Sequence, residues 1–570
     1  MKFLIKKNYI IILFLILLSI STNVFAKDTI ERYSQENISN YFIGIVSISQ
    51  NDNEKAFKQL NKIKKIKDKH SQYNIEFLKT LVLTEKFKKA FIFSKKIQKE
   101  HEVFFEADLL LGINFFLKKD YENAKIYFKK LNKISEYNLY FDNFIGNSLI
   151  AWVRAIQGKK DESFKYIQKI PSPYKNLKEI QNVLLQCYFD DKTTQRSYEQ
   201  LTENQSYDFS RYNYFRVNYL LSKKKINKAR EILQKSTNKN NSNLLLKQSN
   251  YFLLAKKNEK INSFFDCKNP EDSVAELFYI IANLYAADEE YRMSNFYINI
   301  SMLFNEKFST NKALLAENFL MQKKYKKSKD IYSSLKSIGP IYSWFASKNI
   351  AGIILDEKDK KYSINSLQKD FDLLKEKNFE NYYDLANFYK DNGYYKESIK
   401  YYSLVLKKIK KNHYLAPKVL DRRGTSFERL NEWEKAEKDL LESLRILPDQ
   451  ANVLNYLAYT WVDKGINLDK GLVMLKKANE IKKNDGYIID SLGWAYYAKK
   501  NYIKAKYFLQ EAAELLPTDP VINDHYGDSL WMLNKDIQAR HIWSQVLQLD
   551  ETNDDLRKKI KNKIIFGIIK

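Results

Sequence analysis

The stretch IIDSLGWAYYAKKNYIKAKYFLQEAAELLP, residues 488–517, contains two apolar stripes at helical spacing, separated by a polar break. The stripes are Leu492, Gly493 and Tyr496, and then Ala505, Leu509 and Ala512. Apolar residues three or four positions apart form one face of an α-helix, so each half is predicted to be helical. Lys499 to Asn501 form the predicted turn, and Pro517 ends the second helix. Because Gly493 and Ala505 are small, the two helices can approach closely as a helix–turn–helix pair.

The pattern recurs along the chain at a nearly constant period. Ala436, Gly471, Ala505 and Ala539 occupy the equivalent position and follow one another at steps of 35, 34 and 34 residues. A chance helical hairpin does not repeat at a fixed period, so we predict a repeat architecture.

The spacing Leu-Gly-x2-Tyr, then Ala-x3-Leu-x2-Ala, then Pro resembles the 34-residue tetratricopeptide repeat (TPR). The resemblance implies an all-α, right-handed superhelical solenoid of about fifteen helix–turn–helix repeats. It also implies that each repeat contacts only its neighbours and that the first helices line a concave groove for a protein segment.

The small residues that mark the second helix of each repeat, called rungs below, extend almost to the N-terminus. They are Ala56, Ala90, Ala124, Ser163, Ser197, Ala229, Ser263, Ser294, Ser328, Ser363, Ser398, Ala436, Gly471, Ala505 and Ala539. Each is expected twelve residues after a packing position in the first helix. The residues that we expect to carry the packing are Gly112, Ala124, Gly424, Ala436, Ala458, Gly471, Gly493, Ala505, Gly527 and Ala539.

The quality of the pattern suggests limits along the chain. They are a signal peptide over 1–26, N-terminal TPR-like repeats over 27–171, degenerate helical repeats over 172–270, middle repeats over 271–410, C-terminal repeats over 411–552 and a C-terminal capping helix over 553–570. Ile560 and Ile564 belong to the apolar stripe of that last helix, which can cap the end of a solenoid. An amphipathic membrane contact by this helix is the alternative.

The composition suits long helices. Only 14 Gly and 8 Pro occur in 570 residues, and a chain of this length exceeds a single globular core. At the N-terminus, Lys2, Lys6 and Lys7 precede an apolar run, and Ala26 offers a small residue for cleavage. This order is typical of a secretory signal peptide, and the Lys-, Ile- and Asn-rich composition suggests a bacterial periplasmic protein. An uncleaved anchor is the alternative, and it would be the one membrane contact. No cysteine follows the cleavage site, so we expect no lipid anchor.

The two cysteines suggest a disulfide and the high net charge suggests nucleic-acid binding, but the sequence supports neither. Cys187 and Cys267 fall two repeats apart; if each repeat touches only its neighbours, no disulfide joins them and both are core residues. The formal charge is +27, but the lysines are dispersed, so we expect no nucleic-acid partner. Residues 421–552 contain 18 Lys and Arg against 21 Asp and Glu, which makes the C-terminal repeats mildly acidic.

No signature of an enzyme is present in the sequence. The five histidines have no metal-ligand spacing, there is no HExxH or GxSxG motif, and the glycines occur singly. His525, beside Asp524 and Tyr526, is expected on a solvent-exposed helix face. We therefore predict a non-enzymatic protein with no cofactor and no metal.

The binding residues are predicted from their repeat positions. The best-known TPR mode clamps a C-terminal carboxylate with Lys and Asn, but the matching positions here are Asn455, Tyr459, Asp490, Trp494, Asp524 and Asp528. Because the lysines are missing, we expect no such clamp. We predict instead an acidic and aromatic groove that binds a basic or apolar protein segment. Its residues are Tyr459, Asp490, Trp494, Tyr497, Asp524, Asp528 and Trp531, with Asp421 and Glu428 beside them. Trp461 and Trp543 are expected in the core, and packing is the alternative for Trp494 and Trp531.

The predicted function is a periplasmic scaffold or adaptor that binds envelope proteins. Residues 455–548 resemble the C-terminal repeats of large exported bacterial TPR proteins. One branch of that group resembles an adaptor that delivers substrates to a carboxyl-terminal processing protease, although this chain lacks the lipid-anchor cysteine of that branch. The protease or its substrates are therefore candidate partners. A structural component of an envelope or secretion assembly is a second alternative. An enzyme of unrecognised type, which would need a polar pocket with perturbed ionisable groups, is a third.

Overall fold

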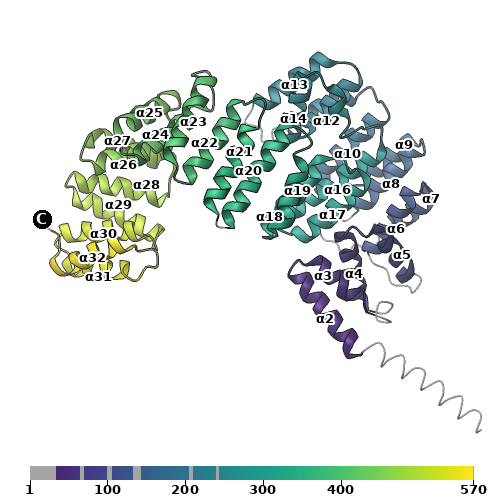
Figure 1. Ribbon diagram of the computed structural model, residues 1–570, viewed down its shortest axis with the longest axis horizontal. Helices are drawn as coiled ribbons and strands as arrows, with labels where there is room; N and C mark the ends of the chain where they lie inside the picture. Colours follow the sequence, from purple (N-terminus) through teal and green to yellow (C-terminus); the bar gives the residue numbers. More distant parts are fainter. Residues whose placement is uncertain are drawn as a thin grey trace, which may run out of the picture. The chain divides into compact units, whose positions relative to one another are not determined.

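The computed structural model describes residues 34–568, except 64–69, 99–104, 133–140, 142, 204–208, 239–242 and 358. The predicted signal peptide lies outside the described residues. The chain divides into two compact units, Met1–Lys358 and Asp359–Lys570, and both consist of paired helices stacked one after another (Figure 1). The described residues form helices and no strands.

Unit 1 contains the helices α2 to α20. Their bounds are α2 Gln35–Ser49, α3 Asn53–Leu60, α4 Ser71–Leu83, α5 Phe87–Gln98, α6 Phe105–Leu117, α7 Tyr121–Leu131, α8 Phe144–Ile156, α9 Lys160–Gln168, η2 Ser172–Tyr174, α10 Lys175–Tyr188, α11 Thr194–Thr202, α12 Tyr212–Ser222, α13 Ile226–Asn238, α14 Leu244–Leu254, α15 Asn258–Asn262, α16 Pro270–Ala287, α17 Tyr291–Phe304, α18 Ser309–Met321, α19 Tyr325–Leu335 and α20 Pro340–Asp356.

Unit 2 contains α21 to α32. Their bounds are α21 Lys360–Asp372, α22 Phe379–Asp391, α23 Tyr395–Lys408, α24 Ala416–Arg429, α25 Trp433–Ile446, α26 Ala451–Asp463, α27 Leu468–Ile481, α28 Gly486–Ala498, α29 Tyr502–Leu515, α30 Pro520–Met532, α31 Asp536–Val546 and α32 Asp554–Phe566. The prediction of an all-α solenoid of helix pairs is confirmed. Every rung lies in the second helix of its pair except Ser263, which follows the end of the short helix α15.

The small residues act as sockets between the two helices of a pair. A Cβ added to Gly493 on α28 would lie 2.7 Å from Leu509 Cγ on α29. At Gly112 and Gly527 the same atom would collide with the rings of Phe128 and Trp543. Each of these large side chains comes four residues after a rung. The glycine of the first helix therefore packs against the second helix one turn after the rung.

A left-handed residue separates the two helices of most repeats. It lies five residues before the rung at Asn51, Glu85, Lys119, Lys224, Glu289, Lys323, Asn431, Lys500 and Asn534. In the repeat quoted first, the N–H of Lys500 donates to the carbonyl of Tyr497 at 2.8 Å, and the N–H of Asn501 to that of Tyr496 at 2.9 Å. These bonds satisfy carbonyls at the end of the helix and turn the chain sharply into the next helix.

Inside unit 1 a later hairpin packs against several of the earlier first helices. The hairpin of α16 and α17 contacts α4, α8 and α10 from much earlier in the chain. Arg292 on α17 pairs with Glu76 at 2.8 Å, and Asn299 donates to the carbonyl of Val82 at 3.0 Å. Eight consecutive residues of α17, from 294 to 301, are buried. The expectation that each repeat touches only its neighbours is therefore wrong for unit 1.

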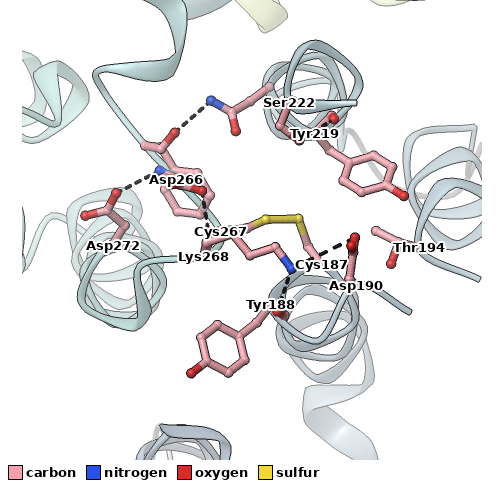
Figure 2. The surroundings of a disulfide bond; sticks show 12 residues. Cys187, Tyr188, Asp190, Thr194, Tyr219, Ser222, Asp266, Cys267, Lys268 and Asp272 are labelled. Atoms are coloured by element: carbon pink, nitrogen blue, oxygen red, sulfur yellow. Dashed lines mark hydrogen bonds and ion pairs between the residues drawn. A yellow bond between two sulfur atoms is a disulfide. The ribbon is translucent and has the colours of Figure 1, made fainter. Parts of the chain in front are cut away.

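A disulfide bond joins Cys187 and Cys267, with their Cα atoms 5.9 Å apart, and the prediction that no disulfide forms is wrong (Figure 2). The physical reason is the return of the chain. After α11 to α15, the start of α16 lies against α10, so residues two repeats apart in sequence become neighbours. Lys268 supports the junction by donating from Nζ to the carbonyl of Tyr188 at 2.8 Å. As predicted, both cysteines are buried.

Unit 2 is a stack of helix pairs that ends with α32. Ile560 of α32 is fully buried among side chains that include Trp543 and Val546 of α31. Arg557 Nη1 donates to the carbonyl of Leu547 at 2.6 Å, which fixes α32 to the residues that follow α31. Within the described parts of both units, no helix is long and apolar enough to cross a membrane.

Candidate protein-binding face

The first helices of the last repeats in unit 2 lie side by side. Contacts join α26 with α28 and α28 with α30, and Tyr456 on α26 donates to Glu428 on α24 at 2.7 Å. Side chains at equivalent repeat positions on these helices are therefore brought into one row. We call this row the acidic–aromatic face. It consists of Asp421 and Glu428 on α24, Tyr459 on α26, Asp490, Trp494 and Tyr497 on α28, and Asp524, His525, Asp528 and Trp531 on α30.

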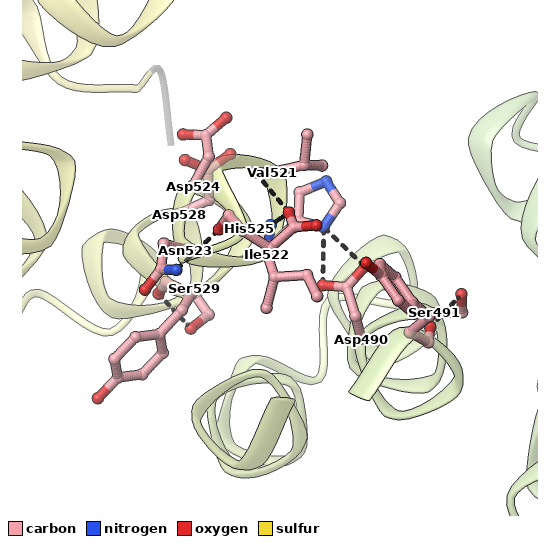
Figure 3. Close-up of polar contacts among 12 residues, drawn as sticks. Asp490, Ser491, Val521, Ile522, Asn523, Asp524, His525, Asp528 and Ser529 are labelled. Atoms are coloured by element: carbon pink, nitrogen blue, oxygen red, sulfur yellow. Dashed lines mark hydrogen bonds and ion pairs between the residues drawn. The ribbon is translucent and has the colours of Figure 1, made fainter. Parts of the chain in front are cut away.

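The centre of the face is a stack of rings held by a carboxylate. His525 Nδ1 contacts the two carboxylate oxygens of Asp490 at 2.9 and 3.2 Å (Figure 3). The His525 ring lies 4.0 Å from that of Trp494, which stacks on Tyr497 at 4.6 Å. Burial lowers the pKa of His525, but the charge of Asp490 and its hydrogen bond, with Asp524 and Asp528, outweigh burial and raise it. A protonated imidazole on Trp494 is also favoured as a cation–π contact.

The C-terminal end of the face is a pair of buried carboxylates. Asp524 and Asp528 lie one turn apart on α30, on the same side of the helix (Figure 3). Nζ of Lys563, on α32, lies 2.7 to 2.8 Å from the oxygens of both carboxylates. Burial, and next the charge of Asp524, raise the pKa of Asp528 to about 7 against the opposing charge of Lys563. The charge of Lys563 therefore opposes the effect of burial and favours the ionised form of Asp528.

Trp531 lies under the chain that follows α32. Its Nε1 donates to the carbonyl of Ile568 at 2.8 Å, and the guanidinium of Arg540 lies 4.8 Å from the centre of its ring. Trp531 is 8% exposed. Asp524, Asp528 and Trp531 were expected to line an open groove; in this structure the end of the chain covers all three.

The remaining part of the face is half-buried, and one polar atom on α26 is unsatisfied. The amide oxygen of Asn455 on α26 is buried without a hydrogen-bond partner among the described residues. Burial, and next the charge of Asp490, raise the pKa of Tyr459 to about 12. Burial is also the largest cause that raises the pKa of Asp421. Tyr456 donates to Glu428 at 2.7 Å. This stretch offers hydrogen-bond acceptors beside aromatic surface.

Sequence reasoning grouped residues that the structure also places near one another, but it missed two of their partners. Tyr459, Asp490, Trp494 and Tyr497 do lie on the shared face, while Trp461 and Trp543 are buried as expected. His525 was expected in solvent, yet it is 8% exposed. The sequence did contain a signal for this contact, because Asp490 and His525 are separated by 35 residues, which is one repeat of 34 residues plus one position. Lys563 was missed because the capping helix gave no indication that its basic face would meet α30.

The face has no arrangement suited to a metal. Among the residues that the structure describes, no group of three or more His, Cys, Asp and Glu side chains could hold an ion. The ten predicted packing residues are all buried within their helices.

A family model described as tetratricopeptide repeat matches residues 379–407. This segment covers α22 and most of α23, and it is one of the helix pairs that repeat along the chain. The chain is a tetratricopeptide repeat protein. The TPR fold supports a protein–protein interaction scaffold.

A curated TPR repeat-containing protein of Pseudomonas aeruginosa is 32% identical over 101 residues. The match covers 18% of this chain and 17% of the relative, so it spans less than a fifth of either protein.

Several solved structures are also similar. Yeast Tom70 is 14% identical over 80% of this chain and 94% of its own, with a TM-score of 0.33. The Cut9–Hcn1 hetero-tetramer is 15% identical over 84% of this chain and 94% of its own, with a TM-score of 0.32. MamA from Desulfovibrio magneticus, from residue 41 to its end, is 17% identical over 31% of this chain and 97% of its own, with a TM-score of 0.28. At TM-scores this low, the likeness carries no argument about function.

Proposed function

We propose that this TPR protein is a non-enzymatic periplasmic scaffold that holds envelope proteins on the acidic–aromatic face of unit 2. The observation that carries the proposal is the row from Asp421 to Trp494, which combines aromatic rings with carboxylates. On the same helix as Tyr459, the amide oxygen of Asn455 has no partner among the described residues. Aromatic side chains flanked by carboxylates suit a basic or apolar protein segment. In unit 1, by contrast, α16 and α17 bury the inner helices.

The finer proposal is an adaptor that delivers substrates to a carboxyl-terminal processing protease. It is supported by the resemblance of residues 455–548 to the exported TPR group. It predicts that the protease or its substrates accompany the intact chain from an envelope extract.

The change Trp494→Ala should reduce the capture of such a partner by about tenfold or more, because a central aromatic residue of an interface typically contributes 2 kcal/mol or more. The measurement is quantitative affinity capture from envelope extract, with the mature chain as bait. The matched control is Tyr507→Ala on the second helix α29, an aromatic residue that is 64% exposed.

Circular dichroism during heating separates lost binding from lost folding. The change Trp494→Phe should keep an aromatic ring stacked on His525, and this variant should still capture most of the partner. If Trp494→Ala retains its partners at the level of the Tyr507→Ala control, the face is not the binding site.

A further inference from the structure

The C-terminal tail, residues 563–568, occupies the acidic end of the face in the manner of a bound segment. Its lysine ammonium sits between Asp524 and Asp528. Two of its main-chain carbonyls are also bound: Trp531 Nε1 donates to that of Ile568, and Arg540 Nε donates to that of Ile564, each at 2.8 Å. The tail is therefore recognised through one positive side chain and through backbone atoms that any peptide possesses.

These contacts are separate from those that fix the rest of α32. Ile560 is fully buried, and Arg557 donates to the carbonyls of Leu547 at 2.6 Å and Thr552 at 3.0 Å. Both residues precede Lys563. Beyond it, Ile565 and Phe566 are 65% and 79% exposed. Ile564 and Ile568 of the tail also pack against the cluster that contains Ile560, but Ile560 and Arg557 hold α32 at positions that precede the tail.

The two aspartates restrict what can take the place of the tail. Asp524 and Asp528 are 8% and 6% exposed, and they lie one helical turn apart. Removing Lys563 without a substitute leaves two neighbouring carboxylates in a poorly solvated site, which favours protonation over ionisation. A replacement that brings its own cation avoids this cost, and a purely apolar segment does not.

We propose that Asp524 and Asp528, with Trp531 and Arg540, form a lysine-binding subsite whose resident occupant is the C-terminal tail. A partner segment that carries a lysine next to apolar residues binds there by displacing the tail. The inference rests on the proposed function, since it names the chemistry of the partner and its regulation. The tail competes with the partner segment for the subsite. While the tail is bound, this end of the face is closed to the partner.

The test uses the full mature chain and a fluorescent peptide with the sequence of residues 559–570, KIKNKIIFGIIK. The change Lys563→Gln in the chain should release its own tail, and the free peptide should then bind about tenfold more tightly than to the wild type. Fluorescence anisotropy gives both dissociation constants. The matched control, Lys559→Gln, alters an exposed lysine one turn earlier and should leave peptide binding at the wild-type level.

Two further arms test the chemistry of the subsite. On the Lys563→Gln chain, a peptide with the same Lys563→Gln change should bind at least about tenfold more weakly than the lysine peptide. Adding Asp524→Asn and Asp528→Asn to that chain should remove the difference between the two peptides. Circular dichroism spectra that match the wild type would show that the helices remain intact.

Equal binding to the wild-type and Lys563→Gln chains, or equal binding of the two peptides, would overturn the proposal. So would a wild-type dimer in sedimentation that dissociates in the Lys563→Gln variant, because the occupant would then be the tail of a second copy. The titration needs no partner protein. Loss of the subsite is thus distinguished from failure of the proposed scaffold function, which the capture experiment measures.

Discussion

Replacement of Arg211 by methionine should lower the free energy of unfolding of unit 1 by about 3 to 5 kcal/mol. Arg211 precedes α12, and its Nε and Nη2 donate to Glu276 on α16 at 3.1 and 2.7 Å. Glu276 has no exposed surface, and it also accepts from Tyr212 at 3.1 Å. The guanidinium lies 4.1 Å from the ring centre of Tyr279. Removing it leaves a buried carboxylate without its counter-charge.

The measurement is hydrogen exchange of peptides from α12 and α16 during urea titration. Peptides from α28 and α30 in unit 2 are the internal control and should be unchanged. The double change Arg211→Met and Glu276→Leu should recover most of the loss, because replacing both members of a buried ion pair by apolar residues is often nearly neutral. A single variant that unfolds at the wild-type urea concentration would contradict the account of this junction.

Loss of the disulfide should have an effect of similar size. Cys187 and Cys267 are separated by 80 positions in sequence, and closing a loop of that length restricts the unfolded chain by an amount worth about 4 kcal/mol in the chain-entropy model. We therefore expect the double change Cys187→Ser and Cys267→Ser to lower the stability of unit 1 by about 2 to 4 kcal/mol. The double change leaves no free thiol, which keeps the comparison clean.

Thermal unfolding with and without a reducing agent checks this expectation. Reduction should lower the unfolding temperature of the wild-type chain towards that of the double variant and leave the variant itself unchanged. If reduction leaves the wild type unaffected, the two cysteines do not form the cross-link in solution.

The repeats were predictable because their signal is local. The small Gly493 and the large Leu509 contact each other within one hairpin, and both residue types can be read directly from the sequence. Ser263 fell just outside its helix because α15 contains only residues 258–262. In that repeat the pattern was already weak, with Tyr251 where most repeats have a small residue.

The disulfide was not predictable from the same reasoning. A repeat pattern specifies contacts between neighbours, whereas the pairing of α10 with α16 depends on how the curvature of several repeats accumulates. Tight packing against the earlier helices then fixes the return, as the bond from Asn299 to Val82 across 217 positions illustrates.

The candidate site lies between these two cases. Repeat positions placed Tyr459, Asp490 and Trp494 on one face, because equivalent positions of successive first helices are neighbours. Lys563 lies in α32, which belongs to no repeat pair, so the pattern contained no information about which aspartates it would meet.

Site-specific photo-crosslinking tests the central claim, that partners bind on the acidic–aromatic face of unit 2, most directly. A benzophenone amino acid would replace Tyr459 on that face and, in a separate chain, Tyr507 on α29. Both chains would be expressed in the native host and irradiated. The account predicts a crosslinked protein partner from position 459 and none from position 507. Crosslinking from position 507 with none from position 459 would contradict it.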